Sequence, residues 1–184
     1  MRLEPIDTPP TLKGRIAAWM MKRQLGKVIM PARVVYNRVP RMYDVAYPLV
    51  RLQQNLELDH TIRALVMSWI AMQNHCHFCV DIARAQALIE KQGMEKLNSL
   101  PEWRTSPVFN DRERAALAFA EEANRSLTVS DETFERVRKL FSEREITEIV
   151  ILCALENFYN RINIPLGIEE DGLCVIQQQR RGAA

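Results

Sequence analysis

Apolar residues recur every three to four positions along most of this chain of 184 residues. The clearest stretch follows Asp59, and its apolar side chains cover most of the circumference of a helix: Ile62, Leu65, Val66, Trp69, Ile70 and Met72. Residues 146–155 have the same character. Because the alternation typical of strands is scarce, this spacing predicts an all-α fold. Helices that are apolar nearly all round belong at its centre.

Capping residues predict where these helices begin and end. Asp59 is the expected N-cap of the first central helix, which we expect to be interrupted at residues 74–75. A second helix should then run over residues 76–92, with Gly93 as its C′ glycine. Ser142, with a glutamate three residues later, predicts a capping box. Other helices are expected before Gly26, over residues 31–37 and 41–54, after Asn110 or Asp111, and from Ser130 or Asp131 to Leu140, with a loop over 99–110.

The two central stretches align with each other without a gap. Residues 64–79 match residues 148–163, which places Cys76 opposite Asn160 and Cys79 opposite Asn163. The match predicts two copies of a helix-break-helix unit, only one of which holds sulfur. We therefore expect one domain over residues 1–184. Its parts are a basic N-terminal segment (1–51), a redox repeat with the cysteine pair (59–93) and a second repeat without it (111–170).

The formal net charge of +2 is unevenly distributed. Residues 1–51 carry ten Lys or Arg and three acids, a balance of +7, and the remaining 15 basic and 20 acidic residues give −5. A basic segment on an acidic body favours self-association, so we expect a homo-oligomer with this segment across the subunit interface. Docking of the segment onto its own chain is the alternative. No nucleic-acid partner is expected, because the basic residues are scattered and accompany no recognised motif.

The chain lacks the apolar runs that membranes and export require. None approaches the roughly 18 residues of a membrane span, and the run at residues 16–21 is shorter than a signal-peptide core. Two of the four cysteines form a C-x-x-C motif, which fits a reducing compartment better than an extracellular disulfide framework. We expect a cytoplasmic protein with no membrane partner.

The motif Cys76-His77-Phe78-Cys79, preceded by His75, is the strongest chemical feature. If a helix starts at this point, both thiols lie on nearly the same face and within disulfide reach. The helix dipole and an adjacent imidazole favour the thiolate, which attacks a peroxide oxygen or a disulfide. The alternative is that the two cysteines only fill a gap between packed helices.

A metal centre fits these residues poorly. Zinc usually takes four ligands, and the cysteines and histidines of the motif point around a helix rather than toward one ion. Cys153 lies within an apolar stretch, and Cys174 and His60 each stand alone. We expect neither a bound metal nor another cofactor.

Residues 65–81 resemble the core motif of the carboxymuconolactone decarboxylase and alkylhydroperoxidase D-like superfamily, in which a helix leads into Asn-x-Cys-x-Tyr/Phe-Cys. The resemblance extends to residues 111–121 and 149–168. It implies an all-helical bundle that assembles into oligomers, with thiol-dependent peroxidase activity in members that hold C-x-x-C. It also implies that Cys79 attacks the peroxide and Cys76 resolves the sulfenic acid. The helix dipole alone would favour Cys76 as the reactive thiol.

The sequence departs from this family at two positions. Redox members usually place a Glu twelve residues before the first cysteine and a His four after the second, and here these positions are Ala64 and Ala83. Such a relay moves the thiol proton to the leaving alkoxide, which contributes ~10²–10⁴ in rate. His75 and His77 are the candidate replacements. Two acids could orient one of them: Asp81 and Glu148.

The sequence thus predicts a peroxidase-like oxidoreductase that reduces hydroperoxides through a Cys76–Cys79 dithiol/disulfide cycle. An external thiol or disulfide reductant would reopen the disulfide. Three alternatives remain: a disulfide reductase without peroxide specificity, a non-catalytic or redox-sensing oligomer that has lost the proton relay, and a lactone decarboxylase of the same superfamily. The decarboxylase is less favoured, since decarboxylation has no obvious need for two cysteines.

Overall fold

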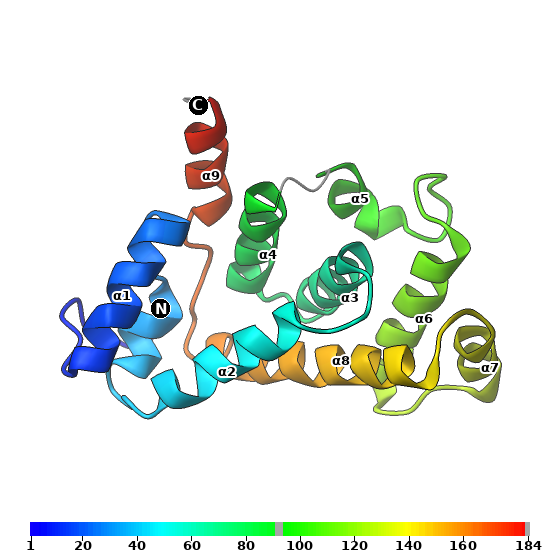
Figure 1. The fold of residues 1–184 in the computed structure, drawn as a ribbon, viewed down its shortest axis with the longest axis horizontal. Coiled ribbons are helices and arrows are strands. Elements are labelled where there is room, and N and C mark those ends of the chain that lie inside the picture. The colour runs from blue at the N-terminus through cyan, green and yellow to red at the C-terminus, as the bar shows by residue number, and fades with distance from the viewer. Residues whose placement is uncertain (91–93, 183–184) are drawn as a thin grey trace.

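A computed structural model describes residues 1–90 and 94–182, and every regular element among them is helical, which confirms the all-α prediction (Figure 1). The elements are α1 (Leu12–Leu25), the π-helical turn η1 (Ala32–Tyr36), α2 (Met42–Gln54), α3 (His60–Gln73), α4 (His77–Ile89), α5 (Met94–Ser99), the 3-10 turn η2 (Leu100–Glu102), α6 (Asp111–Ser126), α7 (Asp131–Leu140), α8 (Glu143–Asn163) and α9 (Leu173–Gly182). None of these helices is long and apolar enough to cross a membrane.

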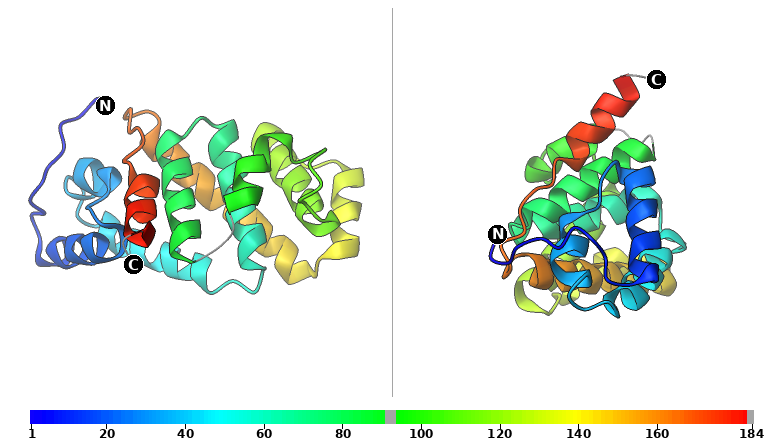
Figure 2. Two further views of the ribbon diagram at one scale, coloured as in Figure 1. Left: turned by 90° about the horizontal axis from the view of Figure 1, so that it is seen from above. Right: turned by 90° about the vertical axis from the view of Figure 1, so that its left-hand side faces the viewer.

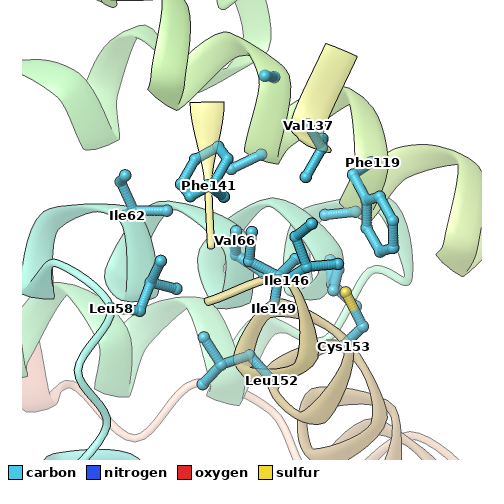
Figure 3. Packing of buried hydrophobic residues seen from close by; sticks show 14 residues of the cluster. Leu58, Ile62, Val66, Phe119, Val137, Phe141, Ile146, Ile149, Leu152 and Cys153 are labelled. Carbon is cyan, nitrogen blue, oxygen red and sulfur yellow. The ribbon is translucent and has the colours of Figure 1, made fainter. Parts of the chain in front are cut away.

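Helix α3 lies at the centre and packs against α4, α6 and α8. Its Val66 and Ile70 are fully buried against Ile149 and Leu152 of α8, in the cluster that Figure 3 displays. Burying each such side chain stabilises the fold by roughly 1.5–3 kcal/mol. The two stretches that are apolar nearly all round therefore form the core, as their pattern predicts.

Helix α9 packs along α4, next to the cysteine motif (Figure 2). The buried Asp81 carboxylate on α4 accepts hydrogen bonds from the backbone N–H groups of Asp171, Leu173 and Cys174 at 3.0, 2.9 and 2.9 Å. These contacts fix the start of α9, where a helix leaves its first N–H groups without partners. Asp81 is thus a helix cap and is not available to orient a histidine.

Several predicted boundaries differ from the observed ones. Helix α4 ends at Ile89 rather than at residue 92, and the expected C′ glycine, Gly93, lies outside the described residues. Residues 99–110 were predicted to be a loop, but α5 extends to Ser99 and the 3-10 turn η2 follows it directly. This start of the predicted loop is ordered because Leu100 and Trp103 are buried in a cluster with residues of α3 and α6. In α7, Phe134 is largely exposed and only Val137 is fully buried.

The basic N-terminal segment docks onto its own chain. The backbone N–H of Arg2 donates to the carbonyl of Leu166 at 2.9 Å, and the backbone N–H of Met30 donates to Oδ2 of Asp171 at 2.7 Å. Helix α1 buries its small residues Gly14 and Ala18, and the face that contains Trp19 is exposed. Small residues are needed on this side because Pro9 packs closely against α1. A Cβ on Gly14 would lie only 2.9 Å from the Pro9 Cβ.

Candidate functional site

The cysteine motif lies at the break between α3 and α4, as predicted. Asn74 caps α3, His75 adopts a left-handed turn with φ 57°, and Cys76 is the N-cap residue of α4. Cys76 and Cys79 form a disulfide with a Cα–Cα distance of 5.3 Å, inside the usual range of about 4.4–6.8 Å. The sharp turn at His75 thus brings both sulfurs into the first turn of α4.

Cys79 is the cysteine of the pair that borders a cavity. It lines a cavity of about 380 Å³, and small-molecule sites typically occupy ~300–1,000 Å³. Cys76 does not belong to this lining, although both cysteines are buried, at 1% and 5% exposure. The walls come from α2, α3, α4 and α8 and are mainly apolar, with Val50, Met67, Phe78, Ile82, Leu152 and Ile162 among their residues.

Helix α8 supplies polar partners to the Cys79 sulfur. The Nδ2 atoms of Asn160 and Asn163 lie 3.2 and 3.5 Å from Sγ and donate to it. Asn160 Nδ2 also donates to Oε1 of Glu156 at 2.6 Å. Positions 156, 160 and 163 share one helix face. When the disulfide is reduced, the two amide donors favour a thiolate at Cys79 over a neutral thiol.

Glu156 is the buried acid of this site. It lines the same cavity as Cys79, and burial raises its pKa from 4.5 to about 7, although the Asn160 hydrogen bond opposes the rise. One amide nitrogen contacts both groups, so the sulfur and the carboxyl lie within two hydrogen-bond lengths of each other. Glu156 can therefore take up or release a proton near neutral pH, close to the sulfur.

The positions of the missing relay face the same space. Ala64 on α3 and Ala83 on α4 both line the cavity that holds Cys79 and Glu156. Their methyl groups leave room where the superfamily usually carries Glu and His. The acid of this chain thus enters the cavity from α8 rather than from α3.

The two histidines of the motif lie elsewhere. His75 and His77 are exposed, and neither belongs to the cavity lining. Glu148, which could have oriented one of them, instead accepts the backbone N–H groups of Glu57 and Leu58 at 3.1 and 2.7 Å. A catalytic part for either histidine stays a prediction, and the buried acid beside the sulfur is Glu156.

A cluster of asparagines holds Asn160 in this orientation. Asn74, in the break before α4, donates from Nδ2 to Oδ1 of Asn160 at 2.8 Å. Its Nδ2 also donates to Oδ1 of Asn124 and of Asn157. Asn124 in turn donates to Oδ1 of Asn74, and Asn157 donates to Oδ1 of Asn124. With its oxygen engaged by Asn74, Asn160 must turn its nitrogen to the sulfur and to the acid.

The sequence predictions missed Glu156 and the roles of Asn160 and Asn163, although two signals point to them. Glu156 is an acid within the most apolar part of α8, where an ionisable group is costly. The internal match pairs Asn163 with Cys79, and these two residues are in contact. The helix break at residues 74–75 of the first unit has no counterpart at the aligned residues 158–159 of the second unit. There α8 continues without interruption to Asn163.

A third missed residue, Tyr159, also lines the cavity. Its hydroxyl accepts a hydrogen bond from Nε2 of Gln53 at 2.9 Å. Burial, together with the charge of Glu156, raises the pKa of Tyr159 to about 12. Tyr159 therefore remains a neutral hydroxyl at physiological pH. Among the residues that the structure describes, no group of three His, Cys, Asp or Glu could hold a metal ion.

Comparisons with known proteins place this site in a family. Residues 36–122 match the model of the carboxymuconolactone decarboxylase family. The uncharacterized protein YnjA of Escherichia coli (strain K12) is 33% identical over 183 residues, which cover 98% of this chain and 100% of YnjA.

Solved structures support the same assignment. One is ATU0492 from Agrobacterium tumefaciens, a protein of unknown function suggested to be the antioxidant defence protein AhpD; it is 26% identical with a TM-score of 0.69 and covers 75% of this chain and 97% of its own. The debrominase Bmp8 has the same fold, with a TM-score of 0.80, 19% identity and 94% of each chain covered. The chain therefore belongs to the carboxymuconolactone decarboxylase family, with an AhpD-like helical fold.

Proposed function

We propose that this protein is a thiol-dependent peroxidase that reduces hydroperoxides through a Cys79–Cys76 dithiol/disulfide cycle. The observation that carries the proposal is the position of Cys79. Its sulfur lines a cavity large enough for a small molecule, and a buried acid with a pKa of about 7 lies within two hydrogen-bond lengths.

The cycle has three steps. The Cys79 thiolate attacks the distal peroxide oxygen, so an S–O bond forms, the O–O bond breaks and an alkoxide leaves with the electron pair. The Cys76 thiolate then attacks the Cys79 sulfur, forms the disulfide and expels hydroxide, which a proton converts to water. An external dithiol supplies two electrons and two protons and restores both thiols. Each turnover consumes one hydroperoxide and one dithiol and yields one alcohol and one water.

Glu156 carries the proton in the first step. As a carboxylate it accepts the proton of the Cys79 thiol, through a water molecule or the peroxide held between them. As a carboxylic acid it returns that proton to the leaving alkoxide. The pKa of about 7 suits both directions of this transfer, because the two forms are then similarly populated at neutral pH.

The cavity favours a peroxidase over a redox sensor or a decarboxylase. A sensor needs only an oxidisable cysteine pair, whereas here one sulfur opens onto a substrate-sized space that also holds an acid. A decarboxylase would have no use for the disulfide between Cys76 and Cys79. An enzyme that turns over is therefore the better account of these residues.

The test is hydroperoxide consumption with a dithiol reductant in excess. The wild-type protein should consume many equivalents of an organic hydroperoxide, and the Cys76→Ser/Cys79→Ser double variant none above background. Cys174→Ser, which changes a half-buried cysteine outside the site, should behave like the wild type. Equal consumption by the wild type and the double variant would refute the proposal, and a single equivalent consumed without turnover would identify a sensor.

We also infer that the protein forms a homo-oligomer through the exposed face of α1. Leu12, Ile16 and Trp19 recur at helical spacing on this face and are 74%, 53% and 60% exposed. They belong to the segment with a charge balance of +7 on a body of −5. Exposed apolar side chains that line up on one helix mark an interaction surface.

Light scattering tests this interface. The Ile16→Ser/Trp19→Ser variant should lower the measured mass toward the 21.3 kDa of one chain. Leu127→Asn, which removes an even more exposed apolar side chain (86%) at the end of α6, should leave the mass of the oligomer unchanged. An unchanged mass for the α1 variant would assign the basic segment to its own chain alone.

A further inference from the structure

Arg63 places a positive charge in the wall of the cavity that Cys79 also lines. Its Nη1 donates to the carbonyl oxygen of Gln53. Its Nε is buried and has no hydrogen-bond partner in the part of the chain that the structure describes. Among those same residues, no carboxylate lies within ion-pair distance of Arg63. A guanidinium is always charged, so its charge is costly without a counter-ion, and an anion that reaches its accessible N–H groups from the cavity would offset that cost.

Arg63 and Cys79 lie near opposite ends of the α3–α4 hairpin that lines the cavity. Helices α3 and α4 form a hairpin through the short connection at residues 74–76, and Cys79 lies next to this connection. Arg63 lies near the other end, at the start of α3, where the last turns of α4 contribute Gln86 and Glu90 to the lining. Seven residues separate Cys79 from Gln86, which is about 10 Å along a helix axis.

The wall between the two ends is apolar. Met67 lies one turn from Arg63 on α3, and Ile82 lies one turn from Cys79 on α4. The other ionisable side chains of the lining are His60, Glu90, Glu156, Tyr36 and Tyr159. The lining therefore has Cys79 toward one end, Arg63 with His60 and Glu90 toward the other, and the apolar side chains of Met67 and Ile82 between them.

We propose that the substrate is a hydroperoxide of an aliphatic carboxylic acid. Its carboxylate pairs with Arg63, its hydrocarbon chain lies along the apolar wall, and its hydroperoxide group reaches Cys79. The planar guanidinium suits a carboxylate, since two parallel N–H groups can donate to the two oxygens. This inference rests on the proposed peroxidase function and adds the substrate class. The reacting bonds are unchanged: the hydroperoxy acid becomes the hydroxy acid, with one water.

Binding without chemistry tests the anion site by itself. Octanoate carries the chain and the carboxylate but no peroxide, so calorimetry on the oxidised protein should detect its binding. Octanol and acetate, each of which lacks one half of the ligand, should bind at least about 10-fold more weakly. Arg63→Gln should raise the Kd of octanoate about 10- to 100-fold, Arg63→Lys should raise it less, and the surface change Arg136→Gln should not alter it.

Turnover tests the substrate class. The kcat/KM for ω-hydroperoxyoctanoate should exceed that for octyl hydroperoxide about 10- to 100-fold, mainly through KM. Arg63→Gln should bring the two values together by weakening only the acidic substrate. Turnover of the neutral octyl hydroperoxide also shows that the variant is folded and active.

The outcomes separate the two proposals. Equal binding of octanoate and octanol, or an octanoate Kd that Arg63→Gln leaves unchanged, overturns the anion site. Arg63-dependent binding of octanoate without any hydroperoxide consumption supports the anion site and refutes the peroxidase. Peroxidase activity with no preference for the acidic substrate supports the proposed peroxidase function and overturns the proposed substrate class.

Discussion

Cys79→Ser should abolish hydroperoxide reduction completely, whereas Cys76→Ser should still reduce one equivalent and then stop. Cys79 lines the cavity and receives the amide donors of Asn160 and Asn163, so we expect its thiolate to perform the first step. Without Cys76 the sulfenic acid at Cys79 has no partner in the site. It should therefore accumulate instead of closing to the disulfide.

Single-turnover kinetics and a sulfenic-acid probe measure this difference. Mass spectrometry of the Cys76→Ser variant should locate the probe on Cys79, at one label per chain. The matched experiment on Cys79→Ser should yield neither alcohol nor label. A full burst of alcohol from Cys79→Ser, with the probe on Cys76, would reverse the roles and make Cys76, at the N-cap position of α4, the attacking thiol.

Glu156→Gln should lower kcat/KM by about 10²–10⁴, the usual contribution of a positioned proton carrier. Glutamine has the same shape and can still accept the Asn160 hydrogen bond, so the loss would report the proton rather than the packing. The pH dependence of kcat/KM shows which protonation state of Glu156 is active. Because the carboxylate is the base, wild-type kcat/KM should rise as pH increases through about 7, where Glu156 loses its proton.

The Glu156→Gln variant should lack this rise of kcat/KM with pH. Restoring an acid from the other wall of the cavity, as Ala64→Glu in the Glu156→Gln background, should recover part of the activity, since Ala64 lines the same space. A Glu156→Gln enzyme with the wild-type rate and an unchanged pH profile would exclude Glu156 as the proton carrier. The proton would then have to come from another group, such as His75 or His77.

Stability measures the same pKa without turnover. The folded-state pKa of Glu156 lies above its ordinary value of 4.5, so the folded chain holds this proton after the unfolded chain has lost it. Its contribution to stability is complete below pH 4.5 and is lost as pH rises through about 7. The free energy of unfolding of the wild type should fall relative to that of Glu156→Gln across this window.

Local patterns were sufficient to predict the central helices and the cysteine pair. Asp59, Asn110 and Ser142 cap their helices with their own side chains, so a few neighbouring residues determine where these helices begin. The disulfide likewise joins residues only three apart on one helical turn. Helix α9 and the short helix α5 were missed, because partners far along the chain stabilise them. For α9 that partner is Asp81, about ninety residues away.

The sequence by itself determined the all-α fold, its two central helices and the disulfide pair Cys76–Cys79, because each depends on periodicity or on spacing within a turn. Only the tertiary structure decided which sulfur faces the cavity and which groups surround it. Glu156 and Asn160 reach Cys79 from a helix some eighty residues away, and Arg63 reaches the same space from α3. Their roles arise from the packing of α8 across α3 and α4, and the spacing of residues along one helix carries no information about that packing.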